Sequence, residues 1–121
     1  MSTAGLGIDL IEIARIERAL DRHPRLADRL FTGAEQQYAA SMGRPGRHLA
    51  ARFAAKEAVV KAMGLGPGTA LRQIEVLSGT PPEVELHGEV GEIANERGLS
   101  LKVSLTHERE MAGAVAIAEQ G

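Results

Sequence analysis

A carboxylate interrupts an apolar segment close to the N-terminus. Asp9 is flanked by Ile8 and Leu10 within residues 5–13, a stretch that predicts a short buried strand. A buried carboxylate is costly unless it is paired or binds a cation. Asp9 therefore either faces water, if the strand alternates, or is positioned to hold a cation, and the sequence leaves both interpretations open.

Three residues that could act together follow at helical spacing. Residues 48–63, rich in Ala, Lys and Glu, predict the strongest helix of the chain. Phe53, Glu57 and Lys61 recur there at i, i+4 and i+8 and so share one face. One interpretation is an exposed Glu57–Lys61 ion pair that contributes roughly a few tenths of a kcal/mol. The other is a carboxylate and an ammonium that act on a ligand.

A positive stripe lies beside this face. Arg52 and Lys56 are four residues apart and form a neighbouring ridge of the same predicted helix, which ends at Gly64. Because further glycines follow Gly64, the stripe would suit a polyphosphate held partly by cationic side chains and partly by a metal. The spacing permits this interpretation without requiring it.

Polar residues also gather at the end of the strand predicted over residues 99–105. Alternation places Ser104 and Thr106 on one side, and His107 lies where the strand opens into a turn. A single histidine in this position is most often a surface residue. No second histidine is spaced to form a zinc site with it.

Arginines form a ridge on the helix predicted to run from the first strand to about residue 22. Arg15, Arg18, Arg22 and Arg25 follow at i, i+3, i+7 and i+10. In a chain with 14 basic and 16 acidic residues and a formal net charge of −2, this ridge favours an acidic docking partner. Four charges are too few to indicate nucleic acid, and the charge balance argues against it as well.

The remaining pattern predicts a single α+β domain over residues 1–121, with helices on one side of a small antiparallel sheet. Thr32 and Glu35 match a capping box that opens a short helix ending near residue 43. The other predicted elements are strands 74–77 and 84–87, a helix over 88–97, and a final strand pair, 99–105 with 113–118, joined by a turn at residues 108–110.

Composition excludes several kinds of site. The absence of cysteine excludes disulfides, thiolate zinc sites and cysteine nucleophiles, and an aromatic content of 2% argues against base-stacking platforms. No apolar run is long enough to span a bilayer, and the N-terminus lacks the basic region of a signal peptide. We therefore expect a cytoplasmic protein without a membrane partner.

Three segments taken together resemble the signatures of the short bacterial 4′-phosphopantetheinyl transferases, the holo-[acyl-carrier-protein] synthase family. The segments are Gly-Ile-Asp-Leu at 7–10, Arg-Phe-Ala-Ala-Lys-Glu-Ala-Val-Val-Lys-Ala-Met-Gly at 52–64, and Ser-Leu-Thr-His at 104–107. They occur in the family's order and span the chain from end to end. The resemblance implies a small antiparallel sheet packed against a long central helix and shorter helices.

The resemblance also implies a catalytic role for four residues. Asp9 and Glu57 correspond to the family's magnesium ligands, and Lys61 to the lysine that contacts the phosphate and the reacting groups. His107 corresponds to a residue that helps to hold coenzyme A. Met111 stands where the family often has an aromatic residue shortly after the histidine, which leaves the detail of the pocket open.

Further positions are implied to bind coenzyme A or a partner. The coenzyme A candidates besides His107 are Arg52, Lys56, Gly64, Ser104 and Thr106. Arg15 corresponds to the helix residue that pairs with acidic side chains of the acyl carrier protein, and the ridge adds Arg18 and Arg22. The family's short members are trimers with active sites between subunits, so the resemblance implies a homotrimer.

The reaction implied by the resemblance is the transfer of 4′-phosphopantetheine from coenzyme A to a serine of apo acyl carrier protein, with Mg²⁺, releasing 3′,5′-ADP. The sequence decides neither the general base nor whether the carrier serves fatty-acid or polyketide synthesis. Two other functions use the same residues: a metal-dependent phosphohydrolase or nuclease, which leaves the arginine ridge unexplained, and a catalytically silent interaction module, against which the set of Asp9, Glu57, Lys61 and His107 argues.

Overall fold

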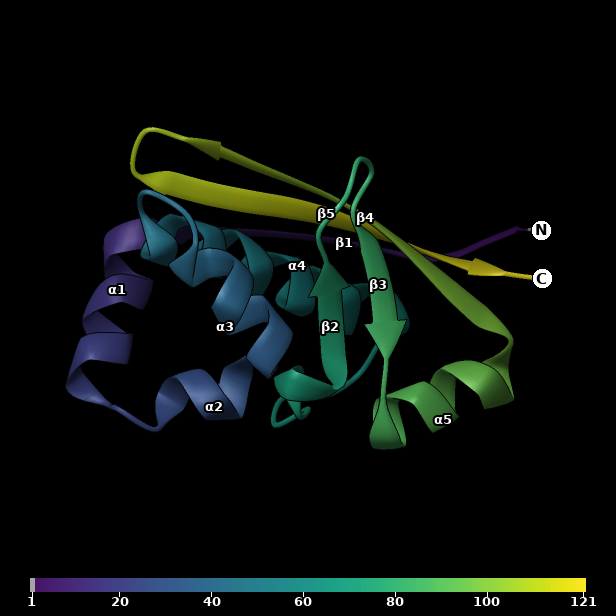
Figure 1. The fold of residues 1–121 in the computed structure, drawn as a ribbon. Coiled ribbons are helices and arrows are strands. Elements are labelled where there is room, and N and C mark those ends of the chain that lie inside the picture. The colour runs from purple at the N-terminus through teal and green to yellow at the C-terminus, as the bar shows by residue number, and fades with distance from the viewer. Residues whose placement is uncertain (1) are drawn as a thin grey trace.

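The computed structural model describes residues 2–121 (Figure 1). Its elements follow in the order β1 (Ser2–Glu12), α1 (Ile13–Arg22), α2 (Leu26–Leu30), α3 (Gly33–Ala40), α4 (Pro45–Met63), a 3₁₀ turn η1 (Leu71–Gln73), β2 (Ile74–Leu77), β3 (Glu83–Leu86), α5 (Gly88–Arg97), β4 (Leu99–Glu108) and β5 (Met111–Gln120). Among these residues, no helix combines the length and the apolar character that a membrane crossing requires.

The long strands form an antiparallel sheet in the order β1-β5-β4, and α4 crosses one face of it (Figure 1). Small side chains line both sides of this contact, because β5 turns a row of alanines toward the helix and α4 presents alanines in return. The buried alanines of these two elements are Ala112, Ala114, Ala116 and Ala118 on β5 and Ala50, Ala51, Ala54, Ala55, Ala58 and Ala62 on α4. Helix and sheet consequently approach closely.

The opposite face of the sheet is apolar and exposed along β1 and β5. Leu6, Ile8 and Leu10 on β1 are 66%, 67% and 67% exposed, and Met111 and Val115 on β5 are also accessible. The strand therefore alternates, as one interpretation of the sequence assumed, but with the large apolar side chains outward. Asp9 faces the helix.

The prediction of an α+β domain is confirmed, with one difference in its sheets. The hairpin of β2 and β3 forms its own two-stranded sheet in front of α4 instead of joining the long strands (Figure 1). Helices α1 and α3 pack against α4, α2 contacts α1 and η1, and α5 contacts β3 and β4. The capping box of Thr32 and Glu35 is present at the start of α3.

Two helices differ from the sequence prediction. The short helix α2 was not predicted, because the first helix was expected to end at about residue 22 and no element was assigned to residues 26–30. Pro45 occupies the first turn of α4, where the missing N–H has no intrahelical partner to lose. The long helix therefore begins three residues earlier than predicted.

Candidate active site

Two glycines of β1 allow the strand to touch α4. A Cβ built on Gly7 would overlap the backbone carbonyl of Ala58, and one on Gly5 would overlap the carbonyl of Ala62. Only glycine fits where two backbones meet this closely. The contact brings Asp9, two residues after Gly7, against the face of α4 that carries Glu57 and Lys61.

Lys61 of α4 reaches across this contact to β1. Its Nζ donates to the carbonyl of Ile8 at 2.8 Å and to Oδ1 of Asp9 at 3.2 Å. The side chain of Asp9 is 19% exposed, whereas that of Lys61 is 53% exposed. No ion pair joins Glu57 to Lys61 within residues 2–121, so the simpler interpretation of that spacing is wrong.

Glu57 lies one turn before Lys61 and shares a cavity with Asp9. Phe53, Arg15 and Leu30 also line this cavity. Burial raises the pKa of the Glu57 carboxyl above its ordinary value, and the negative charge of Asp9 raises it further, while Lys61 opposes both. Two carboxylates that repel each other beside a solvent-accessible cavity are a donor set for a hard divalent cation, which would relieve the repulsion.

Three of the six predicted coenzyme A residues gather at a second pocket. Arg52, Thr106 and His107 line it together with Tyr38 and His48, and it shares no lining residue with the cavity at Asp9. The guanidinium of Arg52 stacks on Tyr38, 4.3 Å from the ring centroid, and its Nε is buried without a hydrogen-bond partner. Burial lowers the pKa of His48, and the nearby cations Arg47 and Arg52 and the imidazole of His107 lower it further. The pocket is thus suited to an anion.

Arg52 is 6% exposed yet lines the second pocket, whereas Lys56 is a coenzyme A candidate that the structure encloses completely. It is 0% exposed, and its Nζ forms an ion pair with Oε1 of Glu35 at 2.8 Å. The prediction that it forms an accessible ridge with Arg52 is therefore wrong, because a fully buried side chain cannot reach a ligand.

The other candidates keep to the surface. Ser104 is exposed on the outer face of β4 and lines neither pocket, and Gly64, with φ of 68°, forms the left-handed C-cap of α4. Arg15, Arg18 and Arg22 are all exposed on α1, and Arg15 also borders the cavity of Asp9 and Glu57. The ridge therefore lies next to the carboxylates.

Comparison with known proteins identifies the family of this chain. The family model of the 4′-phosphopantetheinyl transferase superfamily matches residues 5–116. The chain belongs to that superfamily. It is 50% identical over 117 residues to a holo-[acyl-carrier-protein] synthase of Moorella thermoacetica, an alignment that covers 93% of this chain and 91% of the relative.

Solved members of the superfamily share the fold. The acyl carrier protein synthase of Mycobacterium tuberculosis is 37% identical, with a TM-score of 0.81 and coverage of 99% of this chain and 100% of that one. A holo-(acyl-carrier-protein) synthase from Bacillus anthracis, in complex with CoA (3′,5′-ADP), is 31% identical, with a TM-score of 0.81 and full coverage of both chains (100% and 100%).

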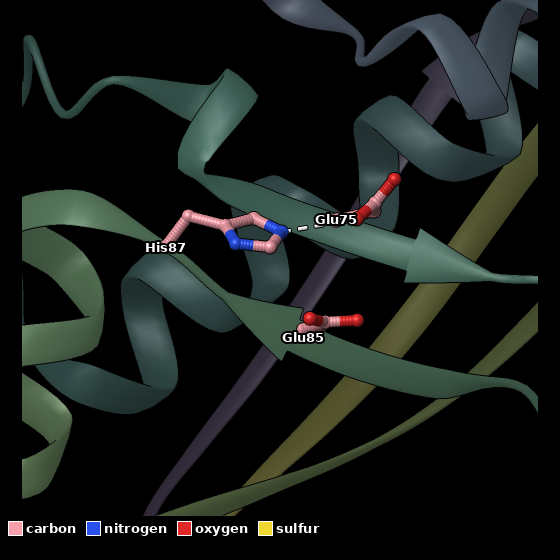
Figure 2. A group of neighbouring side chains, drawn as sticks. All are labelled: Glu75, Glu85 and His87. Carbon is pink, nitrogen blue, oxygen red and sulfur yellow. Dashed lines mark hydrogen bonds and ion pairs between the residues drawn. The ribbon is translucent and has the colours of Figure 1, made fainter.

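A third group of titratable side chains in this superfamily member lies away from both pockets. Figure 2 shows Glu75 and Glu85 on the neighbouring strands β2 and β3, with His87 beyond the end of β3. His87 Nε2 is 2.9 Å from Oε1 of Glu75, and the Thr32 hydroxyl donates to the other oxygen at 2.7 Å. These two hydrogen bonds lower the pKa of Glu75 and give each of its carboxylate oxygens a partner.

Sequence analysis missed two features of this superfamily member's site. Tyr38 and His48 complete the pocket of Arg52, and the signal was the spacing of His48 four residues before Arg52 on the same helix. Residues 66–71 form a wall that borders Glu57, whereas only the glycines of this segment were considered from the sequence, as neighbours of a polyphosphate.

Proposed function

We propose that the chain transfers the 4′-phosphopantetheine group of coenzyme A to a serine of an apo acyl carrier protein. The observation that carries the proposal is the convergence of Asp9, Glu57 and Lys61 at one accessible site, which the approach of β1 to α4 makes possible. The named relatives, and coenzyme A bound to a structural neighbour, support the same reaction.

The reaction exchanges a phosphoanhydride bond for a phosphate ester bond. The serine oxygen forms a bond to the β-phosphorus of coenzyme A, the bond from that phosphorus to the bridging oxygen breaks, 3′,5′-ADP departs with that oxygen, and the serine proton is lost. Lys61, already held by the carbonyl of Ile8, would place its ammonium against the pyrophosphate and stabilise the charge that develops there.

Asp9 and Glu57 are the residues that would hold Mg²⁺. When bound, the ion would neutralise phosphate charge and orient the pyrophosphate. The raised pKa of Glu57 supports this assignment, because burial, first, and the negative charge of Asp9 both destabilise the ionised carboxylate. A bound cation would offset that destabilisation. Arg52 and His107 would hold the remaining phosphate of coenzyme A in the second pocket.

The division of the site between two pockets favours an oligomer. Since Asp9 and His107 line different cavities of one chain, we expect a complete site to pair the Asp9 cavity of one subunit with the His107 pocket of its neighbour. The exposed apolar face at Leu6, Ile8 and Leu10 supplies a surface for the contact, since patches of this kind mark interfaces. We propose a homotrimer. Ile8→Glu should yield a monomer by light scattering.

The ridge of Arg15, Arg18 and Arg22 would bind acidic side chains of the carrier protein beside the site. Its exposure on α1 and the place of Arg15 at the rim of the Asp9 cavity support this role. An incoming carrier bound there would present its serine near Lys61.

One assay tests the proposed function. Apo acyl carrier protein, coenzyme A and Mg²⁺ are incubated with the protein, and the carrier is weighed by mass spectrometry. The expected result is a phosphopantetheine adduct with equimolar 3′,5′-ADP. Cleavage of coenzyme A without an adduct would instead identify a phosphohydrolase, and no reaction with any carrier would contradict enzymatic function.

A further inference from the structure

Lys56 and Glu35 form a closed set of contacts in the core. Lys56 Nζ donates to Oε1 of Glu35 at 2.8 Å, to the carbonyl of Leu71 at 3.0 Å and to that of Ile74 at 2.5 Å. An ammonium has three donors, so all of them are used. Glu35, 2% exposed, also accepts from the backbone N–H groups of Thr32 and Val76, each at 2.8 Å.

The carbonyls bound by Lys56 lie at one end of a segment that borders the proposed site. Residues 66–71 form a wall of the cavity that contains Phe53 and Glu57. At its other end, the segment is tied to α4 by the hydrogen bond from Leu65 N to Val60 O at 2.9 Å. In the described part of the chain, the only side-chain hydrogen bond with both partners inside the wall runs from the Thr69 hydroxyl to the carbonyl of Gly66. Its position therefore depends on its two ends; at the second end Lys56 ties the chain to α4, while Arg72 donates to the carbonyls of Asp28 and Phe31 and ties it to the neighbourhood of α2.

We propose that Lys56 is a positioning residue that fixes this wall against α4 and thereby sets the width of the coenzyme A site next to Glu57. The inference rests on the proposed function for the identity of the ligand. Lys56 and Glu57 are consecutive residues of α4 that face in different directions, so the helix that carries a functional carboxylate also holds the opposite wall of its cavity.

Stability alone does not account for an ion pair at this place. Replacing a buried ion pair by apolar residues of similar volume is often neutral or stabilising, whereas removal of one partner is strongly destabilising. An apolar side chain at position 56 fills the space of lysine but binds neither Leu71 O nor Ile74 O. The feature that lysine alone supplies is therefore the tie to the wall.

The test removes both charges at once, in the double variant Lys56→Met with Glu35→Gln. We expect a folded protein in which amides between residues 65 and 72 exchange hydrogen faster, while amides of β4 and β5 are unchanged. With carrier protein and Mg²⁺ present, KM for coenzyme A should rise about three- to tenfold, the range expected for ordering flexible groups on binding. The kcat and the KM for carrier protein should change less than twofold.

Glu96→Gln on the exposed face of α5 is the matched control and should change none of these quantities. If the double variant does not fold, Lys56→Gln with Glu35→Gln keeps one amide donor and is expected to shift the same quantities by less.

A folded variant with unchanged exchange in the wall and unchanged KM for coenzyme A would overturn the proposal. A uniform increase in exchange over all elements would also overturn it, since that result indicates only a structural role. Exchange is measured without substrates, so it tests the tie even if the wild-type protein transfers nothing. A wild-type protein that transfers nothing would contradict the proposed function and leave the result of the exchange experiment valid.

Discussion

Helix α4 carries two lysine–carboxylate pairs whose surroundings differ completely. Lys56 and Glu35 have side chains that are 0% and 1% exposed, and every donor of the lysine is used. Lys61 and Asp9 are 53% and 19% exposed, and the neighbouring Glu57 has a raised pKa. The distances, 2.8 Å and 3.2 Å, are similar.

The difference indicates which of the two pairs is available to a ligand, since only one of them is exposed and has unused donors or acceptors. A pair whose donors and acceptors are all satisfied has nothing to offer a ligand, whereas a half-exposed pair beside a repelling carboxylate gains from one. Each pair joins a lysine of α4 to a carboxylate on another element, so the assignment depends on what each helix face meets.

The largest effect should come from truncating each lysine in turn. Lys56→Ala leaves Glu35 buried without its cation and should lower the free energy of unfolding by about 3–5 kcal/mol. Lys61→Ala removes an exposed pair and should lower it by less than about 1 kcal/mol, while reducing kcat far more than it raises KM for coenzyme A. Urea unfolding and steady-state kinetics on both variants provide the measurement. Equal losses of stability would remove the distinction between the pairs.

Removing a carboxylate from the exposed group should abolish transfer and leave the fold intact. Asp9→Asn and Glu57→Gln should each reduce kcat by at least about a hundredfold, the usual loss when one preorganised charge-stabilising contact is deleted. Mass-spectrometric rates and thermal unfolding, with Glu96→Gln as the control, measure both properties. Chelation by EDTA should reproduce the loss, and Mg²⁺ or Mn²⁺ should restore activity. Near-normal rates in either variant would show that its carboxylate is not a ligand.

Reversing a charge beside the exposed pair should weaken only the encounter with the carrier protein. Arg15→Glu should raise the KM for carrier protein by more than about fivefold, because repulsion is added to the lost attraction, and Arg18→Glu by less. The KM for coenzyme A should stay within twofold. Raising the salt concentration should weaken the wild-type encounter, since exposed charges are screened over about 8 Å at physiological ionic strength. A carrier KM that responds to neither charge nor salt would place the docking surface elsewhere.

The smallest effect concerns pH. Burial, first, and the charge of Asp9 raise the pKa of Glu57, so the folded protein holds this proton more tightly than the unfolded chain. Its contribution to stability is therefore full below the ordinary carboxyl pKa of 4.5 and is lost as pH rises through the raised value. Glu57→Gln should remove this decline in urea unfolding measured from pH 4 to 8.

Glu17 provides the opposite sign for comparison. The hydrogen bond from Arg44 lowers the pKa of Glu17, so its contribution is present above 4.5 and is lost as pH falls through the lowered value. Glu17→Gln should therefore flatten the acid side of the profile. If both variants shift the profile in the same direction, the assigned causes are wrong.

Local signals predicted most elements of the fold. The capping box at Thr32 and Glu35 and the helix end at Gly64 depend on a few neighbouring residues, and both are present in the structure. Pairing between distant segments was harder to predict. The alternation of β2 and β3 has no feature that says whether they join the long strands, and the structure places them in a separate sheet.

The site was predictable only in part for the same reason. Asp9, Glu57 and Lys61 were identified as candidates from their types and spacing and by resemblance, and the structure brings them together. Lys56 differed because its partner Glu35 lies 21 residues away, on a helix whose packing against α4 the sequence does not reveal. Spacing along one helix cannot distinguish a solvent-exposed row of basic side chains from a lysine that is buried in an ion pair with a distant carboxylate.

The meeting of Gly7 with the carbonyl of Ala58 also restricts how this part of the chain can change over evolutionary time. Side-chain clashes are commonly relieved by a smaller residue on the other surface, so the two positions drift together. Here a Cβ at position 7 would meet main chain, which every amino acid at position 58 possesses. No second-site substitution in the helix can make room. The backbone of α4 therefore requires glycine at position 7. A variant at this position can be rescued only by moving the whole strand, which would carry Asp9 away from Lys61.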